Sequence, residues 1–307
     1  MKTDNSILSW LLDGDPAIRW QTLRDLCNAG TAKTLKERKK IPSEGWGARL
    51  LQRQESSGLW SGGLYTPKWT STTYTMLLLR QLGLDPDHPQ ALKACGLLLN
   101  KGLYHDGGIN FFASLKHSET CVTGIVLSIL AYFDFDDERV ERLVDYLVSQ
   151  QMSDGGWNCR SYNGATHSSF HTTINALEGL REYEKRHPSK TPAQSQKRGV
   201  EFLLVHKLFR SHRTGKIVDS KMTRFSFPPR WKYDIMRALN YFQECNLPCD
   251  PRMSEAIELI KKKQSKNGSW LLQSKHSGKV FFEMEKVGEP SRWNTLRALR
   301  ILKWYEK

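Results

Sequence analysis

Several segments of the sequence place a cationic side chain next to a tryptophan, and three of them are candidates for ligand binding. A lysine or arginine at a helix start favours an anionic ligand, because the backbone N–H groups and the helix dipole there also attract negative charge. An adjacent aromatic wall suits a hydrocarbon chain or a carbocation. The alternative is a solvated basic rim whose tryptophans pack between repeats. The predicted substrate-binding residues are Lys68, Trp69, Arg230, Trp231, Lys232, Tyr233, Arg292 and Trp293.

An acidic residue follows the second of these segments. Asp234 comes directly after Tyr233. A carboxyl group in this place is either a general acid or the ion-pair partner of a neighbouring arginine, and Asp234 is therefore a candidate catalytic residue with a structural alternative.

The segment QQMSDGGWNCR, residues 150–160, has two interpretations. It could be an active-site loop, since glycines let a backbone approach a ligand, or it could tie two elements together. Gly155 and Gly156 permit a tight reversal, Gln151 can satisfy backbone groups at a helix end, and Trp157 has a large surface to bury. We expect the structural role, because helix ends commonly use such residues in this way.

The same pattern recurs along the chain. An amphipathic segment is followed by Gln, a few polar residues, Gly-x-Trp and then a second apolar helix. Complete copies end at Trp60, Trp157 and Trp270, and two eroded copies end at Ile109 and around 202–213. Spacings of about 50 to 60 residues indicate helical-hairpin repeats. The second helices are expected to begin at Ile18, Lys68, His117, His167, Arg230 and Ser291.

These repeats predict an all-α fold, since strand signals are nearly absent. The segments RWQTLR at 19–24 and RWNTLR at 292–297 would be neighbours if the array closed on itself. Closure gives a two-layer ring with the second helices inside. We expect one domain over residues 1–307 with a long insertion loop at about 208–230, and loops of this length are often lids or binding elements.

The composition is that of a globular protein. The chain has 307 residues, 39% of them hydrophobic and 25% charged. It has no apolar run of about 18 residues and no signal-peptide layout, so we expect a cytoplasmic protein. Lys and Arg outnumber Asp and Glu by 46 to 32, which favours anionic small molecules and leaves peripheral membrane contact open. No nucleic acid is expected, because the basic residues are spread along the chain and no such binding motif is present.

A Tyr-Leu-x-x-x-Gln segment followed by Gly-x-Trp resembles the repeat of squalene cyclases and of protein prenyltransferase β subunits. Here it is Tyr146, Leu147, Gln151, Gly155 and Trp157. Through the repeats the resemblance covers nearly the whole chain. It implies an α/α toroid, a six-fold double ring of inner and outer helices, but it indicates the reaction only weakly, because this fold serves many chemistries.

The resemblance also implies a zinc site. Protein prenyltransferases bind zinc through Asp-x-Cys and through the His of a Tyr-His-Thr stretch, and this chain has Glu119-Thr-Cys121 and Phe-His171-Thr. Carboxylate, thiolate and imidazole suit zinc, and three protein ligands with one open position describe a catalytic site. Alternatively, Cys121 and His171 are buried structural residues. Glu119 and His171 are also candidate catalytic residues, and His117 and His167 are further candidates as ligands or acid–base groups.

The same family places an arginine after Gly-Gly-Phe to hold the diphosphate of an isoprenoid. Residues 155–160, GGWNCR, keep this offset, which makes Arg160 a candidate anion clamp.

Three functions stay open. The first is an enzyme, a transferase or cyclase/lyase of the prenyltransferase and squalene cyclase type, that acts on an isoprenoid or other anionic small molecule. The second is a non-catalytic toroid that binds a partner. The third is zinc-dependent thiol chemistry like that of lanthionine-forming cyclases, for which Cys159 would be the second cysteine. A true protein prenyltransferase would also need a helical partner subunit.

Overall fold

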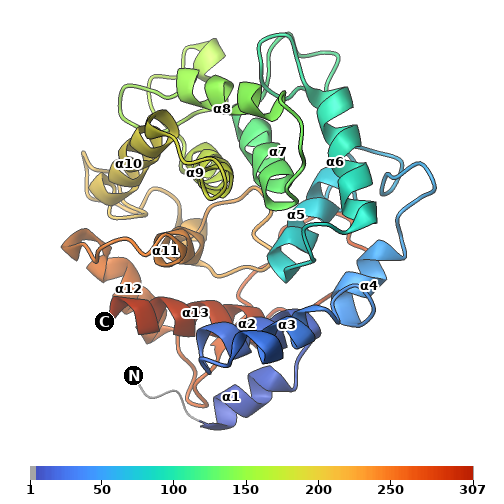
Figure 1. The fold of residues 1–307 in the computed structure, drawn as a ribbon. Helices are drawn as coiled ribbons and strands as arrows, with labels where there is room; N and C mark the ends of the chain where they lie inside the picture. Colours follow the sequence, from blue (N-terminus) through green and yellow to red (C-terminus); the bar gives the residue numbers. More distant parts are fainter. Residues whose placement is uncertain (1–4, 307) are drawn as a thin grey trace. The chain divides into compact units, whose positions relative to one another are not determined.

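The computed structural model describes residues 5–306, which are mainly helical (Figure 1). Helices account for 51% of the residues and strands for 4%, so the helix-rich class predicted from the repeats is confirmed. The helices are α1 (Asn5–Leu12), α2 (Pro16–Asp25), α3 (Thr31–Arg38), α4 (Gly45–Leu51), α5 (Thr72–Leu82), α6 (Pro89–Gly102), α7 (Thr120–Tyr132), α8 (Val140–Ser149), α9 (Phe170–Glu184), α10 (Lys190–Val205), α11 (Ile235–Glu244), α12 (Ser254–Lys262) and α13 (Arg292–Tyr305). The strands β1 (Trp270–Leu271) and β2 (Pro290–Ser291) pair antiparallel.

The helices form two compact units. Unit 1 contains the chain up to Gln52, a short piece at Gln81–Leu84, and the chain from Leu204 onward. Unit 2 contains Arg53–Arg80 and Asp85–Leu203. Closure of the helical repeats into a single toroid stays a prediction from the sequence.

Four of the predicted second helices begin three to five residues later than expected. For two of them capping sets the start: the Ser169 side chain accepts a hydrogen bond from an N–H of α9, and the Asp234 side chain does the same for α11. The residues before these caps are not helical. The placement of Lys68, Arg230 and Lys232 in the first turns of helices was wrong, so the helix-dipole argument for an anion does not apply to them. Arg292 is the first residue of α13, as expected within one residue.

In unit 2, α7 and α9 lie side by side at very short distance (Figure 1). A methyl group placed on Gly124 would come within 2.5 Å of the Asn175 carbonyl oxygen. One on Gly179 would come within 2.6 Å of the Gly124 carbonyl oxygen. Both glycines are thus required for the contact, because any side chain would overlap the neighbouring backbone. The contact fixes the first turns of the two helices next to each other.

The Gln–Trp element connects consecutive helices in unit 2. The Gln151 side-chain amide donates to the Gly155 carbonyl at 2.7 Å and to the Ser195 carbonyl of α10 at 2.8 Å. Trp157 is fully buried; its indole N–H donates to the Leu147 carbonyl at 2.6 Å. The Trp157 backbone N–H donates to a threonine hydroxyl of α9 at 3.0 Å. Equivalent backbone bonds join Trp60 to Thr72, Ile109 to Thr123 and Trp270 to Thr295.

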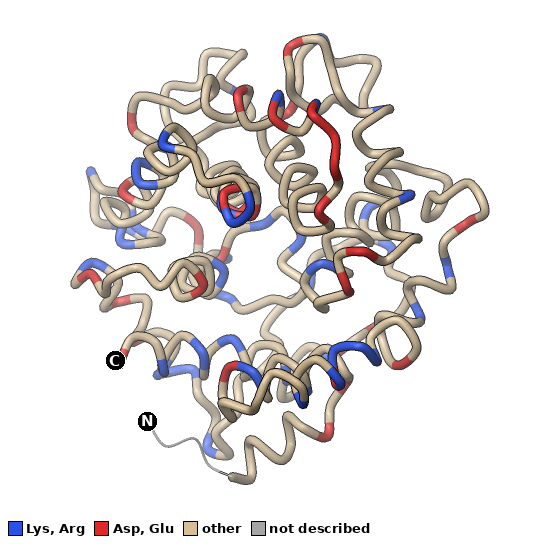
Figure 2. Tube along the Cα trace, in the orientation of Figure 1, with Lys and Arg blue, Asp and Glu red and all other residues tan. Residues whose placement is uncertain are grey.

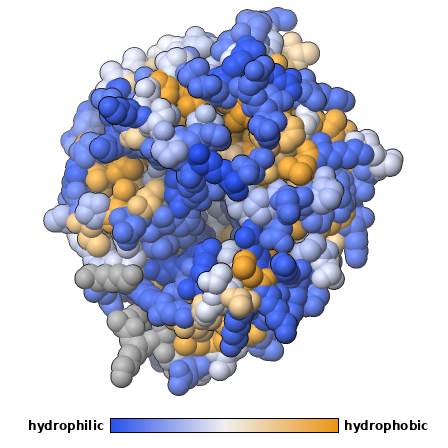
Figure 3. Space-filling model, viewed as in Figure 1, coloured by the Kyte–Doolittle hydropathy of each residue, from blue (hydrophilic) through white to orange (hydrophobic). Residues whose placement is uncertain are grey.

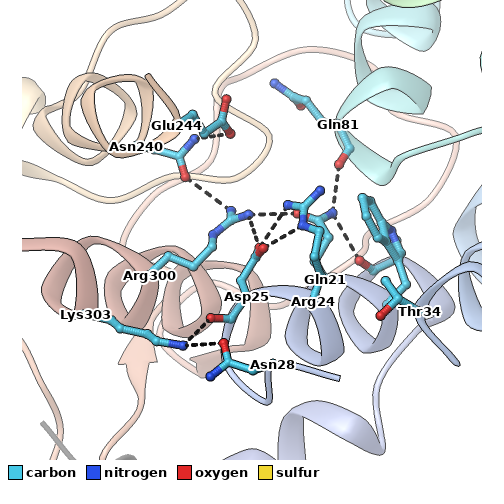
Figure 4. Close-up of polar contacts among 12 residues, drawn as sticks. Gln21, Arg24, Asp25, Asn28, Thr34, Gln81, Asn240, Glu244, Arg300 and Lys303 are labelled. Carbon is cyan, nitrogen blue, oxygen red and sulfur yellow. Dashed lines mark hydrogen bonds and ion pairs between the residues drawn. The ribbon is translucent and has the colours of Figure 1, made fainter. Parts of the chain in front are cut away.

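In unit 1, the two segments with nearly the same sequence are neighbours. Helices α2 and α13 pack together, and Arg300 of α13 donates hydrogen bonds to Gln21 at 3.1 Å and to Asp25 at 3.0 Å (Figure 4). Arg300 also reaches Asn240 of α11 at 3.2 Å. This buried guanidinium therefore links three helices, two of them from opposite ends of the sequence.

The chain between α10 and α11, residues 206–234, contains no α-helix. A turn closed by the bridge between Arg210 and Ile217 is followed by a short 3-10 helix, Ser220–Thr223, and a bridge between Ser226 and Ser274. This region includes the predicted insertion loop.

Lys and Arg are spread along the trace in both units (Figure 2). On the face shown in Figure 3, hydrophilic residues cover most of the visible surface and hydrophobic residues form separate patches. Within residues 5–306, none of the helices has both the length and the apolar character needed to cross a bilayer.

We expect Gln151→Ala to lower the free energy of unfolding by about 1–3 kcal/mol, because two partly buried carbonyl groups lose their donor. Urea denaturation followed by circular dichroism measures the change. The adjacent Gln150 makes only an exposed contact of 3.5 Å, so Gln150→Ala is the matched control and should change stability by less than about 0.5 kcal/mol. Equal effects of the two substitutions would contradict the connecting role of Gln151.

Candidate functional site

Five aromatic side chains gather in unit 2, and we call them the aromatic cluster. The ring of Tyr65 lies 5.2 Å from that of Tyr74, 6.1 Å from Phe111 and 5.7 Å from Phe112, measured between centroids. The Trp69 ring meets Tyr74 edge to face at 4.7 Å. The rings come from the loop before α5, from α5 itself and from the loop between α6 and α7. Tyr65, Trp69 and Tyr74 are buried, whereas Phe111 and Phe112 are partly exposed. Aromatic faces of this kind suit an apolar group or a cation.

Hydrogen bonds hold the loop that carries Tyr65 and Trp69. The backbone N–H groups of Thr72 and Thr73 donate to the carbonyls of Gly63 and Leu64 at 2.9 and 2.8 Å. The Tyr74 hydroxyl donates to the Tyr65 hydroxyl at 2.8 Å. Burial raises the pKa of both tyrosines, so both stay neutral and can donate hydrogen bonds.

Glu119 lies at the N-terminal end of α7, but its side chain does not cap the helix. Its Oε2 atom is buried without a hydrogen-bond partner. Burial raises the pKa of Glu119, while the charges of His117 and Lys68 lower it in part. The carboxyl group is also near enough to the Tyr65 and Tyr74 hydroxyls for its charge to raise their pKa values. Burial thus raises the pKa of the Glu119 carboxyl group above its ordinary value.

Lys68 supplies a positive charge at the same place. Its side chain is exposed, and its Nζ atom lies 5.9 Å from the centroid of Tyr65 and 6.0 Å from that of Trp69. The ammonium group therefore stands over the aromatic cluster and can attract the anionic end of a partly apolar molecule.

Two cysteines meet between the first turns of α7 and α9. The Cys159 sulfur accepts hydrogen bonds from the Cys121 backbone N–H at 3.1 Å and from the Thr172 hydroxyl at 3.5 Å. The thiol of Cys121 also donates to Cys159, which raises the pKa of Cys121 and lowers that of Cys159. Cys159, the second cysteine that thiol chemistry would require, thus lies in contact with the first.

A polar pocket of about 190 Å³ opens beside Cys159 in unit 2. The His117 and Tyr162 rings lie 3.5 Å apart at its wall, and the Tyr146 hydroxyl donates to the Ser118 carbonyl at 3.0 Å. Burial raises the pKa of Tyr146 to about 12. The residues that line the pocket are Asp106, His117, Ser118, Thr120, Tyr146, Gln150, Cys159, Ser161 and Tyr162.

The predicted zinc ligands do not assemble into a metal-binding set. Within residues 5–306, no group of three or more His, Cys, Asp and Glu side chains is arranged to hold a metal ion. Cys121 contacts Cys159, and His171 is the second residue of α9. As these side chains lie, Glu119, Cys121 and His171 do not fit a zinc ion, and no step below depends on a metal. Zinc itself stays a prediction from the sequence.

Two further predicted residues of unit 2 are exposed. His167 precedes α9 and contacts the Thr166 hydroxyl at 2.9 Å through Nδ1. Arg160 lies in the loop after Trp157, where its backbone N–H donates to Asn158 at 2.9 Å. Neither residue lines the pocket beside Cys159. Their roles as an acid–base group and an anion clamp stay predictions.

The other predicted residues belong to unit 1, where most have structural contacts. Asp234 caps α11, accepting from the Arg237 N–H at 2.7 Å, and lies 3.8 Å from the Arg297 guanidinium. Although burial raises the pKa of Asp234, these contacts favour the ion-pair alternative. Tyr233 is buried and donates to the Leu208 carbonyl. The Lys232 ammonium lies 3.8 Å from the Trp231 ring.

Arg292 and Trp293 are likewise held within unit 1. Arg292 donates to the Trp10 carbonyl at 3.0 Å and lies over the Trp10 ring at 4.7 Å. Trp293 is buried and stacks on Phe227 with 4.1 Å between ring centroids. These contacts match the alternative in which the tryptophans of the basic segments pack against the core.

Two predicted substrate-binding residues, Lys68 and Trp69, lie together, and the charge of Lys68 acts on Glu119, which was predicted as a metal ligand and catalytic residue. Sequence reasoning missed the other members of the aromatic cluster. A signal for Phe111 was present: it stands two residues after Ile109, at the offset that separates Cys159 from Trp157 in the next repeat. Aligning the residues after each Gly-x-Trp position would have identified it.

No protein-family model matches the chain, and no curated protein matches it. Among solved structures, a variant of the type II terpene cyclase MstE from Scytonema, in complex with geranylgeranyl dihydroxybenzoate, is 18% identical, with 94% of this chain and 86% of that chain covered and a TM-score of 0.49. Apo MstE is 18% identical over 94% and 88%, with a TM-score of 0.47. A protein from Actinoplanes is 14% identical over 96% and 91%, with a TM-score of 0.47. At these values the similarity does not assign the chain to a family.

We expect Glu119→Gln to raise the melting temperature increasingly as the pH rises from about 4 to 8. Burial holds the folded-state pKa of Glu119 above its unfolded value of about 4.3. The folded protein therefore binds more protons than the unfolded chain in this range, and stability falls as the pH rises through the folded pKa. Glutamine has no charge to bury. Circular dichroism melting at several pH values measures the difference.

Glu258→Gln is the control for this titration, because Glu258 is an exposed glutamate of α12. It should show no gain that grows with pH. A Glu119→Gln difference that is constant or decreases with pH would rule out a buried, neutral carboxyl group.

Proposed function

We propose that the chain is an enzyme that converts an isoprenoid or similar apolar molecule with an anionic end group in unit 2. The observation that carries the proposal is the position of Glu119: a buried carboxyl oxygen without a partner stands close to the aromatic cluster. An unpaired buried carboxyl group is costly for stability, and such groups recur where a protein needs an acid. A purely structural glutamate would have a hydrogen-bond partner.

In the proposed reaction Glu119 is the general acid. A neutral carboxyl group donates its proton to a carbon–carbon double bond of the substrate, and the positive charge that develops on the substrate is stabilised by the faces of the aromatic rings. The apolar chain of the substrate packs on the partly exposed side of the aromatic cluster, at Phe111 and Phe112. Lys68 binds its anionic end, since the ammonium group lies over the Tyr65 and Trp69 rings of the cluster. This combination favours a cyclase-type reaction started by protonation.

A zinc ion is not needed for this chemistry. Elemental analysis of protein purified without chelators tests the zinc prediction separately, with Cys121→Ala and His171→Ala as variants. Near-stoichiometric zinc that both variants lose would support the predicted ligands, and its absence from the native protein would exclude them.

We expect the wild-type protein to convert a long-chain isoprenoid, and Glu119→Gln to lower the rate about 100-fold or more, because general acid catalysis contributes about that much. The probes are geranylgeranyl diphosphate and geranylgeranyl dihydroxybenzoate, and mass spectrometry detects isomeric products. The rate should fall as the pH rises through the raised pKa of Glu119, since the acid is active only when protonated.

Glu258→Gln should keep the wild-type rate, and Lys68→Ala should weaken binding of the diphosphate more than that of an uncharged isoprenoid alcohol. Full activity of Glu119→Gln would contradict the proposed acid. Tight binding of the probes without conversion would instead support a binding protein, and neither binding nor conversion would contradict the proposal as a whole.

A further inference from the structure

We propose that Cys159 and Cys121 form a peroxide-reactive dithiol site, in which Cys159 is oxidised first and Cys121 then closes a disulfide. This inference does not depend on the proposed function of unit 2.

The arrangement of the two thiols carries the proposal. The Cys159 sulfur accepts the backbone N–H of Cys121 at 3.1 Å. The amide nitrogen of Cys121 is one bond from its Cα, so the Cys159 sulfur lies next to the backbone of Cys121. A disulfide between the two residues would bring the sulfurs to about 2.05 Å.

The surroundings distinguish the two sulfurs. Cys159 accepts hydrogen bonds from the first turns of two helices, through the Cys121 N–H of α7 and the Thr172 hydroxyl of α9. Donors at a helix start stabilise negative charge on sulfur and so make it the nucleophile.

Access also favours Cys159. Cys159 lines the pocket of about 190 Å³, whereas Cys121 is not among the lining residues. Liquid water occupies about 30 Å³ per molecule, so the pocket has room for hydrogen peroxide and several waters. An oxidant in the pocket thus meets Cys159 before Cys121.

The reaction proceeds in two balanced steps. The Cys159 sulfur attacks one oxygen of hydrogen peroxide, the O–O bond breaks, and the leaving hydroxide takes the thiol proton to give water and a sulfenic acid. The Cys121 sulfur then attacks the Cys159 sulfur, the S–S bond forms, and the S–O bond breaks. The hydroxyl group leaves as water with the Cys121 proton. Peroxide is reduced and the two thiols are oxidised by two electrons in total.

The disulfide would also change the candidate site. It would link the first turn of α7 to the loop after Trp157, two residues from Glu119. Oxidation is thus expected to hold the start of α7 in place and to remove the free sulfur from the pocket wall.

Peptide mapping tests the proposal directly. Trypsin releases Cys121 in the peptide 117–139 and Cys159 in the peptide 143–160, because cleavage follows Lys116, Arg139, Arg142 and Arg160. After treatment with hydrogen peroxide and alkylation of free thiols, we expect these two peptides to be linked. The link should form about tenfold faster or more than the exposed Cys249 is oxidised, and dithiothreitol should reverse it.

Single variants separate the two roles. In Cys121→Ser, Cys159 should stop at the sulfenic acid, which dimedone traps, whereas in Cys159→Ser the thiol of Cys121 should stay reduced. Cys249→Ser is the control and should still form the link. Should a serine variant fail to fold, as judged by circular dichroism, the alanine variant replaces it, and the mapping of the wild-type protein stands without either.

Three results would overturn the proposal: both thiols remain reduced while Cys27 and Cys249 are oxidised, Cys159 proceeds to sulfinic acid without a link, or Cys121 reacts in Cys159→Ser. None of these readouts uses turnover, so an inactive protein with the predicted link would reject the proposed function alone.

Discussion

The close contact between α7 and α9 is the constraint on which the candidate site depends. Gly124 and Gly179 leave no room for a side chain, so the two backbones touch and the first turns of both helices are fixed side by side. The glutamate and the two cysteines of the candidate site stand at or before these first turns. Glu119 and Cys121 come from α7, Thr172 comes from α9, and Cys159 lies between them. A larger residue at either glycine would move these groups apart.

Near this contact, the carboxyl groups differ in whether their oxygens have hydrogen-bond partners. Asp106 and Asp154 each accept hydrogen bonds from a serine before the next helix, and both are thereby satisfied. Glu119 is different, since its buried Oε2 atom has no hydrogen-bond partner. The contrast separates the two structural aspartates from this glutamate. For this reason Glu119 is the proposed acid. Asp154, despite its Gly-Gly-Trp context, is not proposed as an acid, because its oxygens already accept hydrogen bonds.

The sequence predicted the helix-rich class correctly, because amphipathic periodicity reflects local hydrogen bonds within each helix. It also predicted that the segments around Trp20 and Trp293 are neighbours, which the Arg300 bonds to α2 confirm. Helix starts were less predictable, since apolar spacing does not reveal which serine or aspartate caps the helix. Lys68 and Arg230 were therefore placed in helices when they lie before them.

The composition of the site was predicted only in part. Lys68, Glu119 and Cys121 carry a charge or a thiol, and Trp69 stands next to a lysine, so the sequence identifies them as candidates. Tyr65 and Phe111 are loop residues whose rings meet only in the fold. The partner of Cys121 was equally hidden, because Cys159 is 38 positions away and reaches it only through the contact of α7 with α9. In unit 1, residues such as Asp234 and Trp293 are of types that often bind ligands or catalyse reactions. In the structure, however, Asp234 caps a helix and Trp293 stacks on another ring.

The central claim is that an isoprenoid binds at the aromatic cluster of unit 2. Photo-crosslinking with a diazirine-bearing isoprenoid diphosphate, followed by tryptic peptide mapping, tests it most directly. The account predicts that the label appears on the peptides 54–68 and 102–116, which contain Tyr65, Phe111 and Phe112. Label on the peptides 231–232 or 233–237 of unit 1, with none on those of unit 2, would contradict it.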